Sequence, residues 1–116
     1  MPHQSDLLML RDQLRAFAAA RDWDQFHSPK NLSMALMVEV AELMEHFQWL
    51  TEQQSGSLPA DKMAEVSEEL ADILLYLVRL ADKLGVDLRA AALHKLEKND
   101  RKYPLMLSLL GVSSMA

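Results

Sequence analysis

The sequence contains no cysteine and has few residues that interrupt regular structure. Of its 116 residues, three are glycine and four are proline, and only 6% are aromatic. Without cysteine the chain can form neither a disulfide framework nor a thiolate metal site, so oxygen and nitrogen are its only strong ligand atoms. Because glycine and proline are scarce and no alternating strand pattern occurs, the sequence favours an all-α fold.

Basic charge and long apolar runs are also scarce. The net charge is −5, which argues against a general nucleic-acid-binding protein, because such proteins gain most of their affinity from Lys and Arg. No apolar run approaches the roughly 20 residues that span a membrane, and the N-terminal segment lacks the pattern of a signal peptide. We therefore expect a soluble, cytoplasmic protein with no nucleic-acid and no membrane partner.

Apolar residues at helical spacing predict four main helices in one bundle-like domain. Half of the residues are apolar, so a single folded domain is expected over residues 1–116, with a core of about 5–104 and a tail of 105–116. The predicted helices span about 5–21, 29–50, 61–84 and 88–103, with residues 51–60 as a polar loop. Their start and stop signals are Ser5, Ser28, Pro29, Pro59, Gly85 and Asp87.

The helix expected at 29–50 is apolar on nearly all of its faces. Leu32 and Leu36 lie on one side, while Met34 and Met37 lie elsewhere. A helix of this kind is buried on most faces, and four helices of one small domain cannot cover it. We therefore expect a homo-oligomer. The core stripe of the following helix is expected to be Val66, Leu70, Ile73, Leu77 and Leu84.

Two pairs of carboxylates stand within the most apolar parts of the chain. Glu39 and Glu42 are three residues apart in the helix expected at 29–50, and Glu69 and Asp72 have the same spacing in the next helix. That spacing puts both members of a pair on one helix face. An isolated buried carboxylate is costly, so the pairs call for a cation. The alternative, a solvated face, is weaker for the first pair and equally balanced for the second.

A hard divalent cation fits four carboxylates better than iron does. Iron-binding bundles use a Glu-x-x-His element, whereas Glu42 is followed three residues on by Glu45, and His46 comes one position too late. Mg²⁺, with Mn²⁺ as a substitute, is the better assignment. Since Mg²⁺ is bound by few carboxylates together with substrate phosphates, the cluster implies a phosphorylated ligand.

Basic and aromatic residues near these pairs suggest how such a ligand is held. Lys95, Asn99 and Lys102 fall on one helical face, as phosphate donors would, although basic residues at a helix C-terminus also complement its dipole. Trp23, Trp49 and Tyr76 offer surfaces on which a base could stack, and core packing is the alternative for each, favoured for Tyr76.

Three segments together resemble the all-α nucleoside triphosphate pyrophosphohydrolases of the MazG-like superfamily, most closely the dCTP pyrophosphatase group. They are RDWDQFHSPKNLSMALMVEVAELMEHFQW, EELADILLYLVRLADKLGVDL and KLEKNDRKYP. The resemblance covers about residues 14–104. It implies hydrolysis of a nucleoside triphosphate between the α and β phosphates, and assembly as a dimer or a tetramer made of two dimers. It also implies Mg²⁺ held by residues matching Glu39, Glu42, Glu69 and Asp72.

The resemblance also implies roles for single residues. Lys95, Asn99 and Tyr103 match positions that contact the triphosphate, and Trp49 matches an aromatic that stacks on the base. Trp23, His27 and Tyr76 match pocket positions more loosely. Leu14 stands where some animal members carry a histidine, which weakens the case for strict dCTP preference and leaves dCTP or a modified pyrimidine deoxynucleotide as the expected substrate.

The charges suggest a mechanism and leave two alternatives open. Glu39 or Glu42 would orient or deprotonate the attacking water. Lys95, helped by Arg101 or Lys102, would stabilise the pyrophosphate leaving group. One alternative is a non-catalytic helical oligomer that binds a structural divalent cation or a basic partner. The other is an enzyme of the same fold that acts on dUTP or on oxidised or methylated nucleotides.

Overall fold

The computed structural model describes residues 4–105, which form helices and no strand, so the all-α prediction is confirmed. The chain divides into two compact units, one ending at Gly85 and the other beginning at Val86. Most of the predicted tail, residues 106–116, lies outside the described part. The elements are α1 (Asp6–Ala20), the 3-10 helix η1 (Asp24–Phe26), α2 (Pro29–Glu45), α3 (Glu52–Ser55), α4 (Ala60–Leu84) and α5 (Leu88–Lys102). No helix in this range is both long and apolar enough to cross a bilayer.

The predicted helix ends are confirmed where a local side chain or glycine fixes them. Ser5, Ser28 and Asp87 each accept a hydrogen bond from the backbone N–H three residues on, at 3.0–3.2 Å, which satisfies one free donor of the first turn. Gly85 ends α4 in the left-handed conformation, with φ at 70°, where a residue without Cβ is unstrained. α5 ends at Lys102, before Pro104.

The predicted end of α2 is wrong, and one short helix was not predicted. α2 ends at Glu45 rather than near residue 50. The next turns tighten to i→i−3 hydrogen bonds, such as Phe47 N–H to Met44 O at 2.9 Å, as helix ends commonly do. In the stretch expected to be a polar loop, Thr51 and Gln54 form a reciprocal capping box that starts α3.

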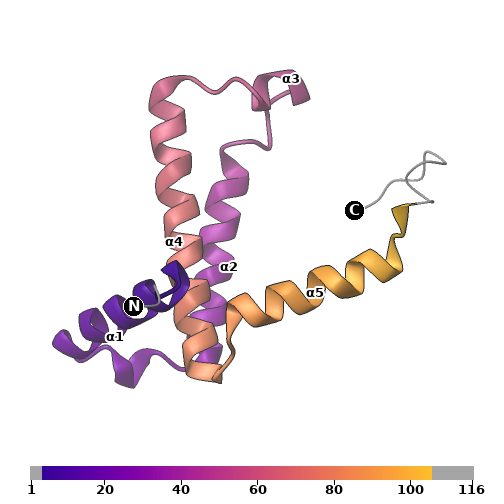
Figure 1. Cartoon of the computed structure of the whole chain (residues 1–116). Helices are drawn as coiled ribbons and strands as arrows, with labels where there is room; N and C mark the ends of the chain where they lie inside the picture. The colour runs from indigo at the N-terminus through magenta and orange to yellow at the C-terminus, as the bar shows by residue number, and fades with distance from the viewer. Residues whose placement is uncertain (1–3, 106–116) are drawn as a thin grey trace. The chain divides into compact units, whose positions relative to one another are not determined.

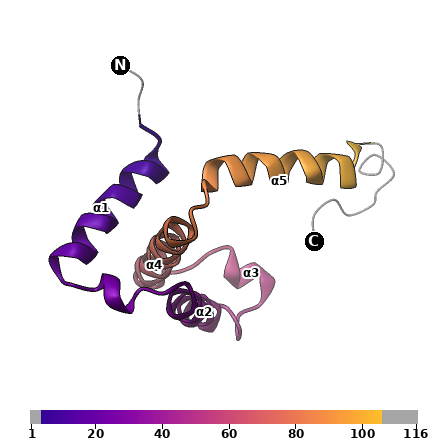
Figure 2. The same cartoon turned by 90° about the horizontal axis from the view of Figure 1, so that it is seen from below.

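The first unit is built on a pair of long helices. α2 and α4 pack side by side and run in opposite directions, and α3 lies in the connection between them (Figure 1). Viewed along the pair, α1 lies beside α4 and crosses it steeply (Figure 2). The buried apolar residues are Ala18, Leu32, Val66, Val78 and Ala81. α5 belongs to the second unit, so a bundle of four helices stays a prediction.

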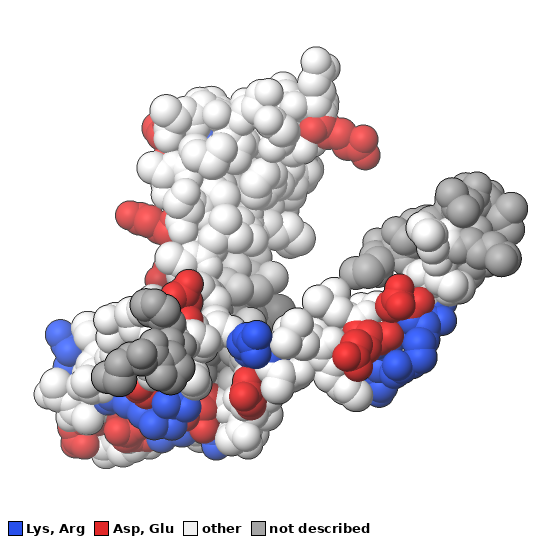
Figure 3. Space-filling model, viewed as in Figure 1, with Lys and Arg blue, Asp and Glu red and all other residues white. Residues whose placement is uncertain are grey.

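Many apolar side chains of the first unit remain exposed. Leu70, Leu77 and Leu84 were expected in the core but are 53%, 38% and 57% exposed in the single chain. Met34 and Met37 on α2 are also more than half exposed. On the face seen in Figure 3, charged side chains gather around α1. The surface over the ends of α2 and α4 that lie next to α3 is largely uncharged.

Candidate functional site

Three carboxylates from α2 and α4 meet between the paired helices. Each of Glu39, Glu69 and Asp72 offers a carboxylate oxygen, and these oxygens all lie within 4.8 Å of one another. The meeting follows from the fold, because Glu69 and Asp72 share one face of α4 and the antiparallel packing brings Glu39 of α2 opposite them. The structure thus brings together three of the four residues singled out as metal ligands.

Two oxygens of this cluster lack the partners that buried polar atoms normally have. Within residues 4–105, Glu39 Oε2 and Glu69 Oε2 are buried and have no hydrogen-bond partner. An unpaired buried carboxylate oxygen is strongly unfavourable unless a proton or a cation compensates it. The donor set consists of carboxylate oxygens alone, which suits Mg²⁺ or Mn²⁺. Glu39, Glu69 and Asp72 therefore fit a hard divalent cation.

The crowding of negative charge changes the acidity of the cluster. Burial raises the pKa of Glu39 to about 7, and the neighbouring Glu69, Glu42 and Asp72 carboxyls add to the shift. Burial also raises the pKa of Glu69, with Glu42 and Asp72 contributing in the same direction. Glu42, the fourth predicted ligand, is partly buried and lies outside the group of three, yet it is near enough for its charge to act on both. A proton or a cation thus relieves the same repulsion.

The aromatic residues proposed to hold a base lie in different settings. Trp49 stands in the turns after α2 and is 86% exposed, so core packing is excluded for it in the single chain. Trp23 is 43% exposed and meets Phe17 edge to face, with the ring centroids 5.5 Å apart. Tyr76 is partly buried on α4, one turn beyond Asp72.

The candidate phosphate-contacting residues all belong to α5 and its end, in the second unit. Lys95, Arg101 and Lys102 are exposed, whereas Asn99 and Tyr103 are partly buried. The Tyr103 N–H donates to Asn99 O at 2.7 Å and closes the helix. The Lys102 Nζ lies 5.3 Å from the centre of the Tyr103 ring. Their approach to the carboxylate cluster stays a prediction.

One buried cation was not singled out from the sequence. Arg79 of α4 is only 5% exposed and forms an ion pair with Asp24 of η1 through Nη2. Its Nε donates to His27 Nδ1 at 3.1 Å, so it holds the segment that carries Trp23 and His27. The available signal was a single charge in the apolar run LLYLVRLA, but its partners lie 55 and 52 residues earlier.

Comparison with known families gives one match over most of the chain. The model of the MazG-like family matches residues 34–108. This segment contains both acid pairs and the basic end of α5. The resemblance seen in the sequence is therefore confirmed.

Curated proteins and a solved structure resemble the chain closely. It is 48% identical over 94 residues to dCTP pyrophosphatase 1 of Mus musculus and 50% identical over 95 residues to that of Homo sapiens. Each match covers 79% of this chain and 55% of the relative, so the chain spans about half the length of these proteins. The crystal structure of a pyrophosphatase from Archaeoglobus fulgidus is 40% identical, with a TM-score of 0.82, and the match covers 90% of this chain and 97% of that one.

Proposed function

Because this chain belongs to the MazG-like family, we propose that it hydrolyses a nucleoside triphosphate to the monophosphate and pyrophosphate. The observation that carries the proposal is the group of Glu39, Glu69 and Asp72, in which two buried oxygens lack partners. A divalent cation at this position would compensate them and bind the phosphates of a substrate. The dCTP pyrophosphatases that resemble the chain support a nucleotide as that substrate.

The carboxylates of α2 and α4 would hold the cation and prepare water for attack. Bound Mg²⁺, or Mn²⁺ in its place, neutralises charge on phosphate oxygens and makes water more acidic. Glu39, Glu69 and Asp72 would supply the ligands. Glu42, whose charge acts on Glu39 and Glu69, is the carboxylate left to orient the water or take its proton. Glu39 is the alternative base.

Residues of α5 would bind the leaving group. Lys95 and Lys102 carry positive charge on an exposed helix, and charge placed near the pyrophosphate lowers the energy of the transition state. Asn99, Arg101 and Tyr103 would complete the phosphate contacts. This role requires α5 to approach the carboxylate cluster of its own chain or of another subunit.

A pyrimidine deoxynucleotide is the proposed substrate, either dCTP or a modified form. Trp49 would stack on the base, with Trp23, His27 and Tyr76 lining the pocket, and the high exposure of Trp49 leaves its ring free for that contact. Leu14, which is partly buried on α1, cannot supply the hydrogen bond of a histidine at its place. We therefore propose a broader preference than strict dCTP hydrolysis.

We also propose that the chain works as a homo-oligomer, a dimer or a tetramer made of two dimers. The support is the number of exposed apolar side chains on α2 and α4, among them Met34, Met37, Leu70 and Leu77. Apolar surfaces of this extent are typical of interaction sites. A cytoplasmic location, where nucleotide pools are kept, completes the proposal.

A panel of nucleoside triphosphates tests the proposed function. It should contain the canonical deoxynucleotides, dUTP, and oxidised and methylated forms, each with Mg²⁺, and the products should be separated by ion exchange. Monophosphate and pyrophosphate from pyrimidine deoxynucleotides are expected. Diphosphate and phosphate would overturn the reaction class, preference for dUTP or a damaged purine would correct the substrate, and no product from any nucleotide would favour a non-catalytic oligomer.

A further inference from the structure

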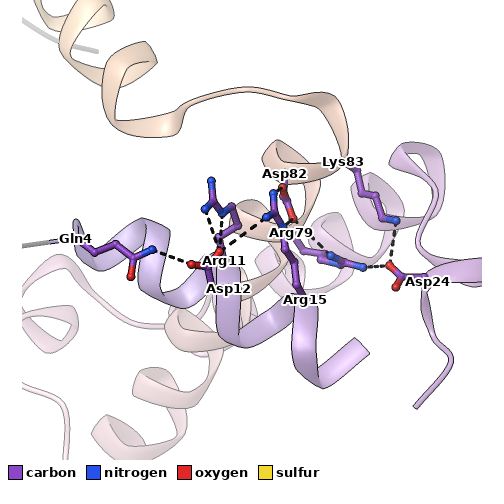
Figure 4. A network of polar contacts seen from close by, with 8 residues as sticks. All are labelled: Gln4, Arg11, Asp12, Arg15, Asp24, Arg79, Asp82 and Lys83. Carbon is purple, nitrogen blue, oxygen red and sulfur yellow. Dashed lines mark hydrogen bonds and ion pairs between the residues drawn. The ribbon is translucent and has the colours of Figure 1, made fainter. Parts of the chain in front are cut away.

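Arg79 is a buried charge whose three guanidinium nitrogens are all used. Nη2 pairs with Asp24, Nη1 lies 3.5 Å from Asp82 Oδ2, and Nε donates to His27 Nδ1 at 3.1 Å. Figure 4 shows Arg79 between the two aspartates. A buried guanidinium is kept only where such partners surround it. The position of the ring of His27 is therefore tied to α4 through Arg79.

The bond from Arg79 fixes the proton of the imidazole. Arginine has five N–H donors and no acceptor, so a nitrogen that meets it within hydrogen-bond distance must present a lone pair. Nδ1 of His27 is that nitrogen, and the neutral ring then carries its proton on Nε2. Among the described residues Nε2 donates to no acceptor. It is also not among the buried unpartnered atoms, so it opens to the surface as an unused donor.

The charges around His27 keep it neutral. Arg79 and Lys83 come from α4, and Asp24 comes from η1, where it accepts from Lys83 Nζ at 3.0 Å. Asp82 of α4 is already bound by Arg15 of α1, with Nε to Oδ2 at 2.8 Å. Two cations, Arg79 and Lys83, therefore act on His27 against one carboxylate, Asp24. Burial lowers the pKa of His27, and the charge of Arg79 lowers that pKa further.

The free donor stands beside an exposed aromatic ring. The centroids of Trp23 and His27 are 6.1 Å apart and their planes are tilted by 57°, and Trp23 is 43% exposed. A flat surface with one fixed donor at its side suits a planar heterocycle that has an acceptor on its edge. The carbonyl oxygen and the unprotonated ring nitrogen of a cytosine are such acceptors.

We propose that Arg79 is a positioning residue that holds His27 as a hydrogen-bond donor, through Nε2, for an acceptor on the base of the nucleotide. This inference rests on the proposed function and adds a specificity contact to it. Arg79 itself does not touch the substrate. It acts by setting which ring nitrogen of His27 is protonated and where the ring points.

Two variants of His27 test the direction of the contact. In the His27→Gln variant the side-chain amide can place an N–H near the position that Nε2 occupies in the wild type. In the His27→Asn variant the shorter side chain reaches only the position of Nδ1. We expect His27→Gln to stay within about threefold of the wild-type KM for dCTP, and His27→Asn to raise KM roughly tenfold, the effect of one net hydrogen bond. The value of kcat should change little. Equal KM values for the two variants would overturn the proposal.

The tautomer and the role of Arg79 are read directly by nitrogen NMR of the imidazole. In the full wild-type chain Nε2 should be protonated, and its N–H resonance should shift when dCMP is added.

Arg79→Lys should populate both tautomers and raise KM, with no further rise in a His27→Asn background. Lys62→Met is the control: it removes an exposed cation of the same helix, which pairs with Glu65 at 3.3 Å and is not among the charges that act on His27, so it should leave the tautomer and KM unchanged.

The outcomes separate this inference from the proposed function. If the wild-type chain hydrolyses no nucleotide, the function fails, and the NMR spectra with dCMP then decide the inference alone. If hydrolysis occurs but the proton lies on Nδ1, or Arg79→Lys changes stability and not KM, the inference fails and the function stands. If Arg79→Lys does not fold, the His27→Gln and His27→Asn pair gives the decision.

Discussion

Glu39 and Glu69 each have a buried carboxylate oxygen without a hydrogen-bond partner. Apolar residues at these positions would avoid that cost. The neighbours of the two glutamates on α2 and α4 are apolar or exposed, so nothing in the local sequence requires a carboxylate for folding. Repulsion among Glu39, Glu69 and Asp72 destabilises the protein without a cation. Residues that reduce stability in this way are typical of functional sites. The unpaired oxygens of the cluster thus support the proposed cation site.

Single amide substitutions of Glu42 and Asp72 should remove activity while the fold persists. We expect Glu42→Gln and Asp72→Asn each to lower kcat/KM by on the order of 100-fold or more, because charge stabilisation of several kcal/mol is lost. Circular dichroism should show unchanged helix content. The matched control is Glu68→Gln, since Glu68 is an exposed acid on the same helix. Full activity of either variant, measured as pyrophosphate release with Mg²⁺, would remove that residue from the site.

The pKa of Glu39 predicts how stability depends on pH when no divalent ion is present. The folded-state pKa is about 7, above the ordinary 4.5, so the folded state binds the proton more tightly and stability falls as pH rises from about 4.5 to about 7. Thermal unfolding in EDTA should show this decline in the wild type and a smaller one in Glu39→Gln. Mg²⁺ should restore stability above pH 7 in the wild type alone. Identical pH profiles for both proteins would contradict the assignment.

At the residue scale, the sequence revealed charges but not all of their partners. Glu69 and Asp72 could be grouped because their spacing is local, and antiparallel packing then brought Glu39 to them. Arg79 could not be interpreted, because its partners Asp24 and His27 are far away in the chain. Only the fold determines which distant groups satisfy a buried charge.

At the scale of the elements, the end of α2 places Trp49, the residue proposed to stack on the base, outside the helix. α2 stops at Glu45, so Trp49 stands in the following turns and exposes 86% of its surface. We expect Trp49→Ala to raise KM for pyrimidine triphosphates roughly tenfold through loss of base stacking, and to change stability by less than about 0.5 kcal/mol, as at an exposed site. Trp49→Phe should keep most of the affinity. Unchanged kinetics in Trp49→Ala would exclude the stacking role.

The left-handed glycine that ends α4 provides a test of the fold itself. Gly85 has φ at 70° and open space around an added Cβ, so Gly85→Ala should cost only backbone strain, about 1 kcal/mol. Gly56→Ala is the matched control, because Gly56 has φ at −89° and an ordinary 3.7 Å contact to Gln53 O. Urea unfolding should show a loss for Gly85→Ala and little change for Gly56→Ala. Equal effects would argue against this helix end.

The ends of the helices could be predicted where the start or stop signal lies within one turn. They stayed ambiguous where no such local signal stands out. Ser28 and Asp87 identified the starts of α2 and α5, because a capping side chain acts within one turn. The end of α2 was missed because Phe47, Trp49 and Leu50 continue its apolar run without glycine or proline. α3 was missed because its capping box stands among serine, glycine and glutamine residues that are typical of loops.

At the scale of the whole molecule, the exposed apolar surface supports the proposed assembly. Leu70 and Leu77 follow the spacing of a core stripe and yet are exposed in the single chain. The apolar spacing in the sequence would be explained if a partner subunit covered them. The second unit, from Val86 on, carries the basic residues proposed to bind the phosphates. Assembly and completion of the site are therefore expected to depend on one another.

A charge placed on the exposed face of α2 should break the proposed assembly. Met37 is 68% exposed, and a buried glutamate at an interface is strongly unfavourable, so Met37→Glu should shift the mass measured by light scattering towards the monomer and reduce activity. Met9→Glu is the matched control on α1, where Met9 is 44% exposed. A monomeric wild type with full activity would refute the proposed oligomer.

The most direct test of the central claim follows dCTP by phosphorus NMR in the presence of Mg²⁺, with the wild type and Glu69→Gln in parallel. Glu69 lies in the carboxylate cluster and has an unpaired buried oxygen. The expected result is dCMP and pyrophosphate from the wild type, with the reaction slowed by on the order of 100-fold in Glu69→Gln. Formation of dCDP and phosphate, or equal pyrophosphate release by both proteins, would contradict the claim.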